Sequence, residues 1–131
     1  MKQMFIKKEN LVIFTENLKN SCDEFIAPKR EHLGDIIFGD VKDDGGELLD
    51  YEGNSVISPR AFLLPQTEPL FEIKSVKNCD FSPIEDKKKR VFYGVRPCDI
   101  KALRLMEKFF IGGEFEDKPY QEKFRNSVFI A

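Results

Sequence analysis

The feature that most constrains the fold is an apolar segment that ends at a tight turn and is followed by a helical pattern. Four of the five residues 91–95 are apolar and two of them are β-branched, which predicts a strand covered on both faces. Gly94 lets the backbone turn, and Pro97 fixes the chain just before a new element. After Pro97, apolar residues recur at three- and four-residue spacing, which predicts a helix over 99–110. In open α/β sheets, ligand-binding residues commonly lie where a strand ends and leads into a helix in this way.

Weaker patterns predict the other elements of a single mixed α and β domain. Apolar spacing predicts a short helix over 10–20, and residues 23–28 and 34–41 predict two strands that pair antiparallel. Ser58 followed by proline is a helix start signal, and residues 126–131 begin another apolar strand. The fold class that follows is α/β, with a central mixed sheet and helices that cover it.

Several polar stretches are predicted to lie outside regular structure. Residues 75–86 and 114–121 are predicted to be irregular or loop segments, and the basic run 87–90 is predicted to be an exposed loop. The acidic, glycine-containing run 40–47 lacks the ligand spacing of a calcium loop, so we interpret it as a solvated turn. His32, the single histidine, lies in a charged stretch and is predicted to be solvent-exposed.

Composition excludes several functional classes. The chain has 131 residues and a net charge of -2, so nothing indicates nucleic acid as a partner. No apolar run approaches the roughly 20 residues that span a bilayer, and the N-terminus lacks a signal-peptide pattern, which predicts a cytoplasmic protein. The three cysteines are odd in number and widely spaced, which argues against a disulfide framework and against a self-contained metal site.

The residues that could carry chemistry gather where the predicted strand meets the predicted helix. Cys98 lies at the helix start beside Arg96 and Asp99, in an electropositive setting that lowers a thiol pKa. A buried, inert cysteine remains the simplest alternative. Nucleophilic catalysis would need a base, and His32 is distant in the sequence. A thiolate ligand of a metal cluster needs no base, but its sulfur partners would come from outside this chain.

A second candidate is a polar break between prolines. Pro65 and Pro69 interrupt the helix that starts after residue 58, and a further short element is expected to end near Ile73. Gln66 and Glu68 lie within the break. It is either a surface turn or a rigid support that presents these side chains to a cofactor or partner.

Two of these motifs resemble a known family. The segments Ser58-Pro59-Arg60 with Phe62–Glu68, and above all Tyr93–Ala102, resemble the N-terminal region of the iron-sulfur electron-transfer subunits of sulfhydrogenases and anaerobic sulfite reductases. These are the hydrogenase β-subunit and sulfite reductase A-subunit family. The resemblance implies that residues 1–131 are the N-terminal scaffold domain of a longer protein, ending before a ferredoxin-like part that binds 4Fe-4S clusters.

The resemblance also implies roles for particular residues. Cys98 is expected to be a ligand of a 4Fe-4S cluster in the full-length protein, and the expected cofactor-binding residues are Cys98, Asp99, Arg96, Gln66 and Glu68. This chain alone is expected to hold no cluster and to have no catalytic residue of its own. The partners implied are a flavin-containing subunit and a hydrogenase or sulfite reductase subunit, between which electrons pass.

Two other functional classes stay open from the residues alone. One is a cysteine-dependent enzyme with Cys98 as nucleophile, and the other is a cofactor-free subunit-docking module. A thiol that is open and faces a groove left by a missing C-terminal part favours the electron-transfer interpretation, whereas a sealed thiol favours the docking module.

Overall fold

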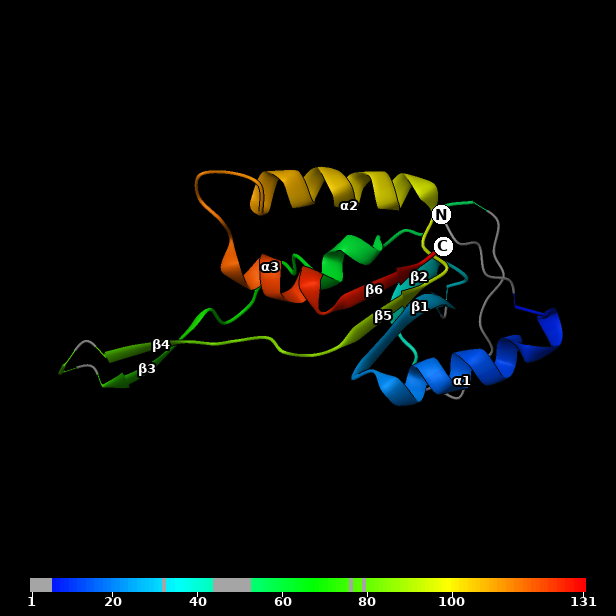
Figure 1. Cartoon of the computed structure of the whole chain (residues 1–131), viewed down its shortest axis with the longest axis horizontal. Helices are drawn as coiled ribbons and strands as arrows, with labels where there is room; N and C mark the ends of the chain where they lie inside the picture. The colour runs from blue at the N-terminus through cyan, green and yellow to red at the C-terminus, as the bar shows by residue number, and fades with distance from the viewer. Residues whose placement is uncertain (1–5, 32, 44–52, 76, 79) are drawn as a thin grey trace.

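A computed structural model of the chain shows a mixed α and β domain (Figure 1). It describes residues 6–31, 33–43, 53–75, 77–78 and 80–131. His32 and residues 44–47 of the acidic run lie outside these described residues, as does Cys79. No helix in the described ranges combines the length and the apolar character needed to cross a bilayer.

The domain is built around a four-stranded sheet. Its strands are β1 (Glu24–Arg30), β2 (Ile36–Asp40), β5 (Arg90–Tyr93) and β6 (Ser127–Ile130), in the spatial order β2-β1-β5-β6. β1 runs antiparallel to β2 and parallel to β5, and β5 runs parallel to β6. The predicted antiparallel pair and the predicted mixed sheet are therefore confirmed.

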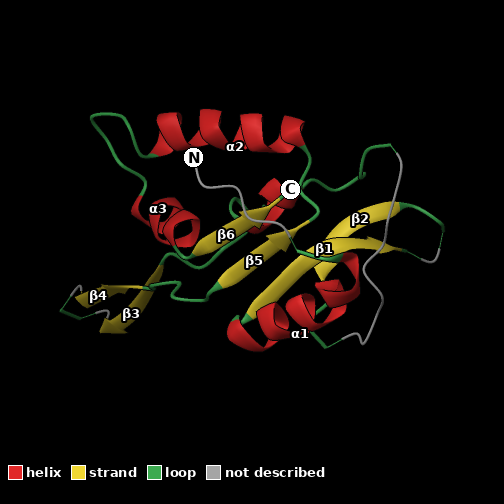
Figure 2. Ribbon diagram, turned by 45° about the vertical axis from the view of Figure 1, so that its right-hand side comes forward, coloured by secondary structure: helices red, strands yellow, loops and turns green. Residues whose placement is uncertain are grey.

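Helices cover both faces of this sheet (Figure 2). Helix α1 (Leu11–Ser21) lies on one face, and α2 (Pro97–Phe110) and α3 (Lys118–Arg125) lie on the other. Because successive strand residues point to opposite faces, β1 and β5 contribute to both layers of the core. The layer under α1 contains Cys22, Phe25, Ala27, Val41 and Val91. The layer under α2 and α3 contains Ile26, Phe38, Leu63, Phe92, Val95, Leu103 and Tyr120.

The junction between β5 and α2 has the predicted form. Gly94 adopts a positive φ of 72°, which lets the chain turn directly after the strand. Helix α2 begins at Pro97, two residues earlier than predicted, because proline is well suited to the first helical position. Arg96 is the extended residue that precedes the helix, and Cys98 is the second residue of the helix.

The prediction that residues 75–86 are irregular was wrong for Ser75 and for residues 80–83, which lie in strands. β4 (Asp80–Pro83) pairs antiparallel with β3 (Phe71–Ser75) to form a separate two-stranded sheet. The strands have only five and four residues, so their alternation of apolar and polar residues is too short to be decisive, and the pairing depends on contacts across the hairpin.

The prediction of a loop over residues 114–121 was also wrong in its second half. Residues 118–125 form α3, whose first turn is capped by Asp117, with its carboxylate accepting the Tyr120 N–H at 2.9 Å. Tyr120 is fully buried and stacks on Phe124, with ring centroids 5.9 Å apart. A polar eight-residue helix of this kind is stabilised mainly by tertiary packing, which its local composition does not reveal.

Candidate functional site

The candidate thiol lies at the carboxyl end of the parallel strands, on the surface. Cys98 is exposed on the first turn of α2, directly after β5. At this position unpaired backbone N–H groups and the positive end of the helix dipole attract negatively charged groups. Cys22, by contrast, is buried under α1, and burial raises the pKa of its thiol. Cys98 is therefore the cysteine suited to chemistry among those that the structure describes.

A hydrogen bond joins the two motifs that carry the family resemblance. The Ser58 hydroxyl donates to a carboxylate oxygen of Asp99 over 3.0 Å. Ser58 also caps the short helix η2 (Pro59–Phe62), accepting from the Arg60 backbone N–H at 3.4 Å and from its Nε at 3.2 Å. Segments 41 residues apart in sequence thus meet beside Cys98.

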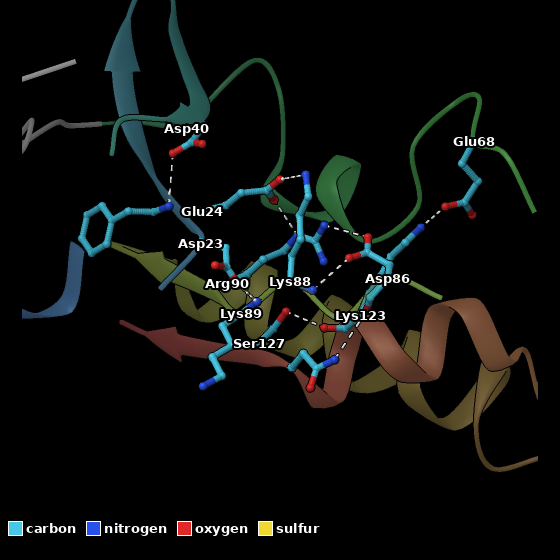
Figure 3. Close-up of polar contacts among 12 residues, drawn as sticks. Asp23, Glu24, Asp40, Glu68, Asp86, Lys88, Lys89, Arg90, Lys123 and Ser127 are labelled. Atoms are coloured by element: carbon cyan, nitrogen blue, oxygen red, sulfur yellow. Dashed lines mark hydrogen bonds and ion pairs between the residues drawn. The ribbon is translucent and has the colours of Figure 1, made fainter. Parts of the chain in front are cut away.

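The predicted site residues fall into two separate groups. Arg96, Cys98 and Asp99 lie together at the start of α2. Glu68 instead forms an ion pair with Lys123 of α3 (Figure 3), and Gln66 is an exposed residue two positions before it.

The pairing of Glu68 places it at the opposite end of the sheet from Cys98. The carbonyl of Lys123 accepts a hydrogen bond from the Ser127 hydroxyl at 2.6 Å, and Ser127 is aligned with Arg90 at the amino ends of β6 and β5. Cys98 follows the carboxyl end of β5. The structure therefore does not bring Glu68 and Cys98 into one site.

The amino end of the sheet holds an ion-pair cluster that the sequence reasoning missed. Arg90 is only 5% exposed, and its guanidinium contacts Glu24 at 2.7 Å and Asp86 at 2.7 Å (Figure 3). Lys88 contacts the same Glu24 at 2.6 Å. These residues line a cleft of about 600 Å³ that also includes Lys123.

Arg90 is buried in β5, so the prediction of an exposed loop is wrong for this residue. Residues 87–89 are exposed as predicted. One sequence feature could have indicated this ion pair: β1 begins with the acidic Glu24 and β5 with the basic Arg90. These two residues are direct neighbours in the parallel pairing of the strands. Detecting it required knowledge of which strands pair.

The ion-pair cluster around Arg90 lowers the pKa of its two carboxylates, Glu24 and Asp86. Burial alone would raise the pKa of Glu24, but hydrogen bonds from Lys88 and Arg90 outweigh it and hold that pKa below its ordinary value. For Asp86 burial is likewise outweighed, here by the hydrogen bond from Arg90 and the backbone N–H of Lys88, so its pKa is also lowered. Both carboxylates are thus stabilised in their charged form, as expected of structural ion pairs.

The described residues do not fit a complete iron-sulfur cluster. Such a cluster needs four ligands, usually cysteine thiolates. Within the described ranges, no group of three or more His, Cys, Asp or Glu side chains is arranged to hold a metal ion. Cys98 can supply one ligand, and the remaining ligands would have to come from elsewhere.

Comparison with known proteins gives one informative similarity. No family model matches the chain, and no solved structure matches it. Among curated proteins, the chain is similar to Sulfhydrogenase 2 subunit beta of Pyrococcus furiosus, with 28% identity over 83 residues. The aligned region is 63% of this chain but 23% of that protein, so the chain corresponds to a minor part of its relative's length. The relative's name fits the hydrogenase β-subunit resemblance that the two motifs carry.

Proposed function

We propose that the chain is the N-terminal scaffold domain of an iron-sulfur electron-transfer subunit in a hydrogenase-type complex. In this proposal Cys98 supplies one thiolate ligand of a 4Fe-4S cluster whose other ligands lie outside the described residues. The subunit relays electrons between a flavin- or nicotinamide-dependent partner and a hydrogen-evolving or sulfite-reducing subunit, in the cytoplasm. The similarity to a sulfhydrogenase β subunit supports the hydrogenase part of this proposal.

The observation that carries the proposal is the exposure of Cys98 on the first turn of α2. A sealed thiol would have favoured a cofactor-free module, and a ligand for an external cluster has to be accessible. Backbone N–H groups at a helix start are also suited to the sulfur atoms of a negatively charged cluster. Cys98 is therefore accessible to an external cluster and lies where backbone N–H groups would attract the negative charge of that cluster.

The neighbouring residues would orient the thiolate and set its surroundings. Asp99 is fixed by the 3.0 Å hydrogen bond from Ser58, which ties the first turn of α2 to η2. Arg96 places a positive charge directly before the helix. Charges and hydrogen bonds around a ligating sulfur tune the reduction potential of a cluster, while the redox chemistry belongs to the cluster itself.

The test uses the full-length protein that this proposal implies, in which further cysteines would follow residue 131. Iron and sulfide content and visible absorption are measured after reconstitution, for the unchanged sequence, for Cys98→Ala and for Cys22→Ala. We expect Cys98→Ala to lose the iron and sulfide of one cluster, because alanine offers no ligand. Cys22→Ala is the matched control and should retain the full content, since Cys22 is buried in the core. Equal content in all three proteins would exclude Cys98 as a ligand.

A further inference from the structure

The hairpin formed by β3 and β4 has one apolar face that is open to solvent. Phe71 and Ile73 are two positions apart on β3, so their side chains point to the same face. Their partners across the hairpin are Pro83 and Phe81. Phe71, Ile73 and Phe81 are 63%, 59% and 57% exposed. We call these four residues the hairpin face.

This face lies away from the packed layers of the domain. In both views the hairpin extends beyond the end of the central sheet, next to α3 (Figures 1 and 2). A two-stranded hairpin is at best marginally stable by itself in water. Contiguous exposed apolar side chains rimmed by polar residues commonly mark protein-binding sites. The hairpin face therefore has the properties of a surface that a partner covers.

A groove continues the hairpin face toward α3. This cavity of about 710 Å³ lies between the base of the hairpin and the amino-terminal end of α3. Its apolar lining consists of Leu70, Phe71, Pro83, Ile84 and Pro119. The apolar surface thus runs from the hairpin into a hollow deep enough to accept a side chain.

The rim of the groove is strongly acidic. Five carboxylates line it against one lysine, Lys118; they are Glu68, Glu85, Glu116, Asp117 and Glu122. Glu68 and Glu85 are ion-paired with Lys123 and Lys87. The other three carboxylates have no ion pair among the described residues. Two of them accept hydrogen bonds: Asp117 from the Tyr120 N–H at 2.9 Å and Glu116 from Gln121 Nε2 at 3.2 Å.

We propose that the hairpin face and this groove bind a segment of a partner protein that carries an apolar side chain next to Lys or Arg residues. The apolar side chain would fill the groove against Phe71 and Ile84, and the basic residues would neutralise the rim carboxylates Glu116 and Glu122. Complementary charge of this kind selects partners and speeds their association. This inference goes beyond the electron-transfer proposal and does not depend on it, since Cys98 lies at the other end of the sheet.

The charge of the rim argues against a second copy of the chain as the occupant. In a two-fold symmetric dimer the same patch faces itself, so the two acidic rims would meet. Like charges brought together at an interface disfavour association. A basic partner removes this repulsion.

The test is selection of a displayed random peptide library on the immobilised chain. We expect the enriched peptides to carry Lys or Arg beside an aromatic or large aliphatic residue. Their affinity should fall at least tenfold for the double variant Phe71→Thr, Ile73→Thr, in which threonine keeps the strand propensity while removing the apolar face. The matched control Val12→Gln, Leu105→Gln removes two side chains of similar exposure on α1 and α2, 65% and 70%, and should bind normally.

A second variant tests the role of charge separately. Glu116→Gln with Glu122→Gln should weaken the selected peptides severalfold at low salt and less at high salt, because salt screens the rim. Backbone amide NMR spectra of each variant establish that the hairpin is still formed.

Three results would overturn the proposal: enriched peptides without basic residues, affinity unchanged in the Phe71→Thr, Ile73→Thr variant, or a dimer that this variant abolishes. The last result would assign the face to a second copy. Cluster incorporation should be unaffected by these hairpin variants, and peptide binding should be unaffected by Cys98→Ala. The two proposals can therefore fail independently.

Discussion

The polar side chains at the two ends of β5 differ in how deeply they are buried and in how they are paired. At the amino end Arg90 is 5% exposed and is held by two carboxylates, Glu24 and Asp86. At the carboxyl end Cys98 is exposed on a helix start, and its neighbour Asp99 accepts a hydrogen bond from Ser58. The comparison indicates that the amino end stabilises the fold, while the carboxyl end is available to a ligand, as is general for open α/β sheets.

The largest effect is expected from breaking the buried cluster. Arg90→Met leaves Glu24 and Asp86 partly buried without their shared cation, and loss of one partner of a buried ion pair costs about 3–5 kcal/mol. Urea unfolding at pH 7 measures this loss. Arg104→Met is the control, since Arg104 is exposed on α2, and it should change stability by less than about 0.5 kcal/mol. Similar costs for the two variants would show that the buried ion pairs of Arg90 contribute no more to stability than an exposed arginine does.

A smaller effect should follow from acidification. Because the pKa of Glu24 is lower in the folded chain than in the unfolded chain, the folded state binds fewer protons in the acidic range. Its contribution to stability is present above the ordinary carboxyl pKa of about 4 and is lost as the pH falls through the lowered value. Glu24→Gln should therefore be less stable at pH 7 and lose less stability on acidification. Urea midpoints at several pH values between neutrality and strong acid measure both changes, and parallel profiles would contradict the assignment.

The carboxyl end of β5 was predictable from the sequence because its signals are local. An apolar run, Gly94 and Pro97 together specify a strand, a turn and a helix start, and Cys98 stands between the last two. No partner segment has to be known for this inference. The structure shifts the bounds of the two elements: β5 covers Arg90–Tyr93 rather than 91–95, and α2 begins at Pro97.

The amino end was not predictable in the same way because its contacts are distant in sequence. Glu24 and Arg90 are 66 positions apart and meet only through the parallel pairing of β1 with β5. Glu68 reaches Lys123 only because α3 forms, and α3 depends on the packing of Tyr120 rather than on its own helix propensity. The link between Ser58 and Asp99 was missed for the same reason, although both residues belong to recognised motifs.

Removing the hydrogen bond between Ser58 and Asp99 should lower the free energy of unfolding by less than loss of the Arg90 ion pairs and by more than loss of the Cys98 side chain. Ser58→Ala deletes the donor to Asp99 and the cap of η2, and losses of this kind cost about 1 kcal/mol. Urea unfolding measures the change, and Ser55→Ala, three residues earlier in the chain, is a nearby control. If the proposed function holds, Ser58→Ala in the cluster-loaded full-length protein should also shift the reduction potential, since Asp99 would lose its fixed orientation. An unchanged potential would leave the hydrogen bond as a purely structural contact.

The smallest effect on stability is expected at Cys98 itself. Cys98→Ala removes an exposed side chain and should change the free energy of unfolding by less than about 0.5 kcal/mol, whereas Cys22→Ala removes a buried one and should cost more. Alkylation by iodoacetamide, followed by mass spectrometry, should label Cys98 well before Cys22 in the folded chain. If Cys98→Ala were as costly as Cys22→Ala, or if Cys98 resisted alkylation, the thiol would be a packing residue. Little effect on stability together with rapid alkylation would support the proposed ligand role, because a side chain that does not stabilise the fold is free to bind a group from outside the domain.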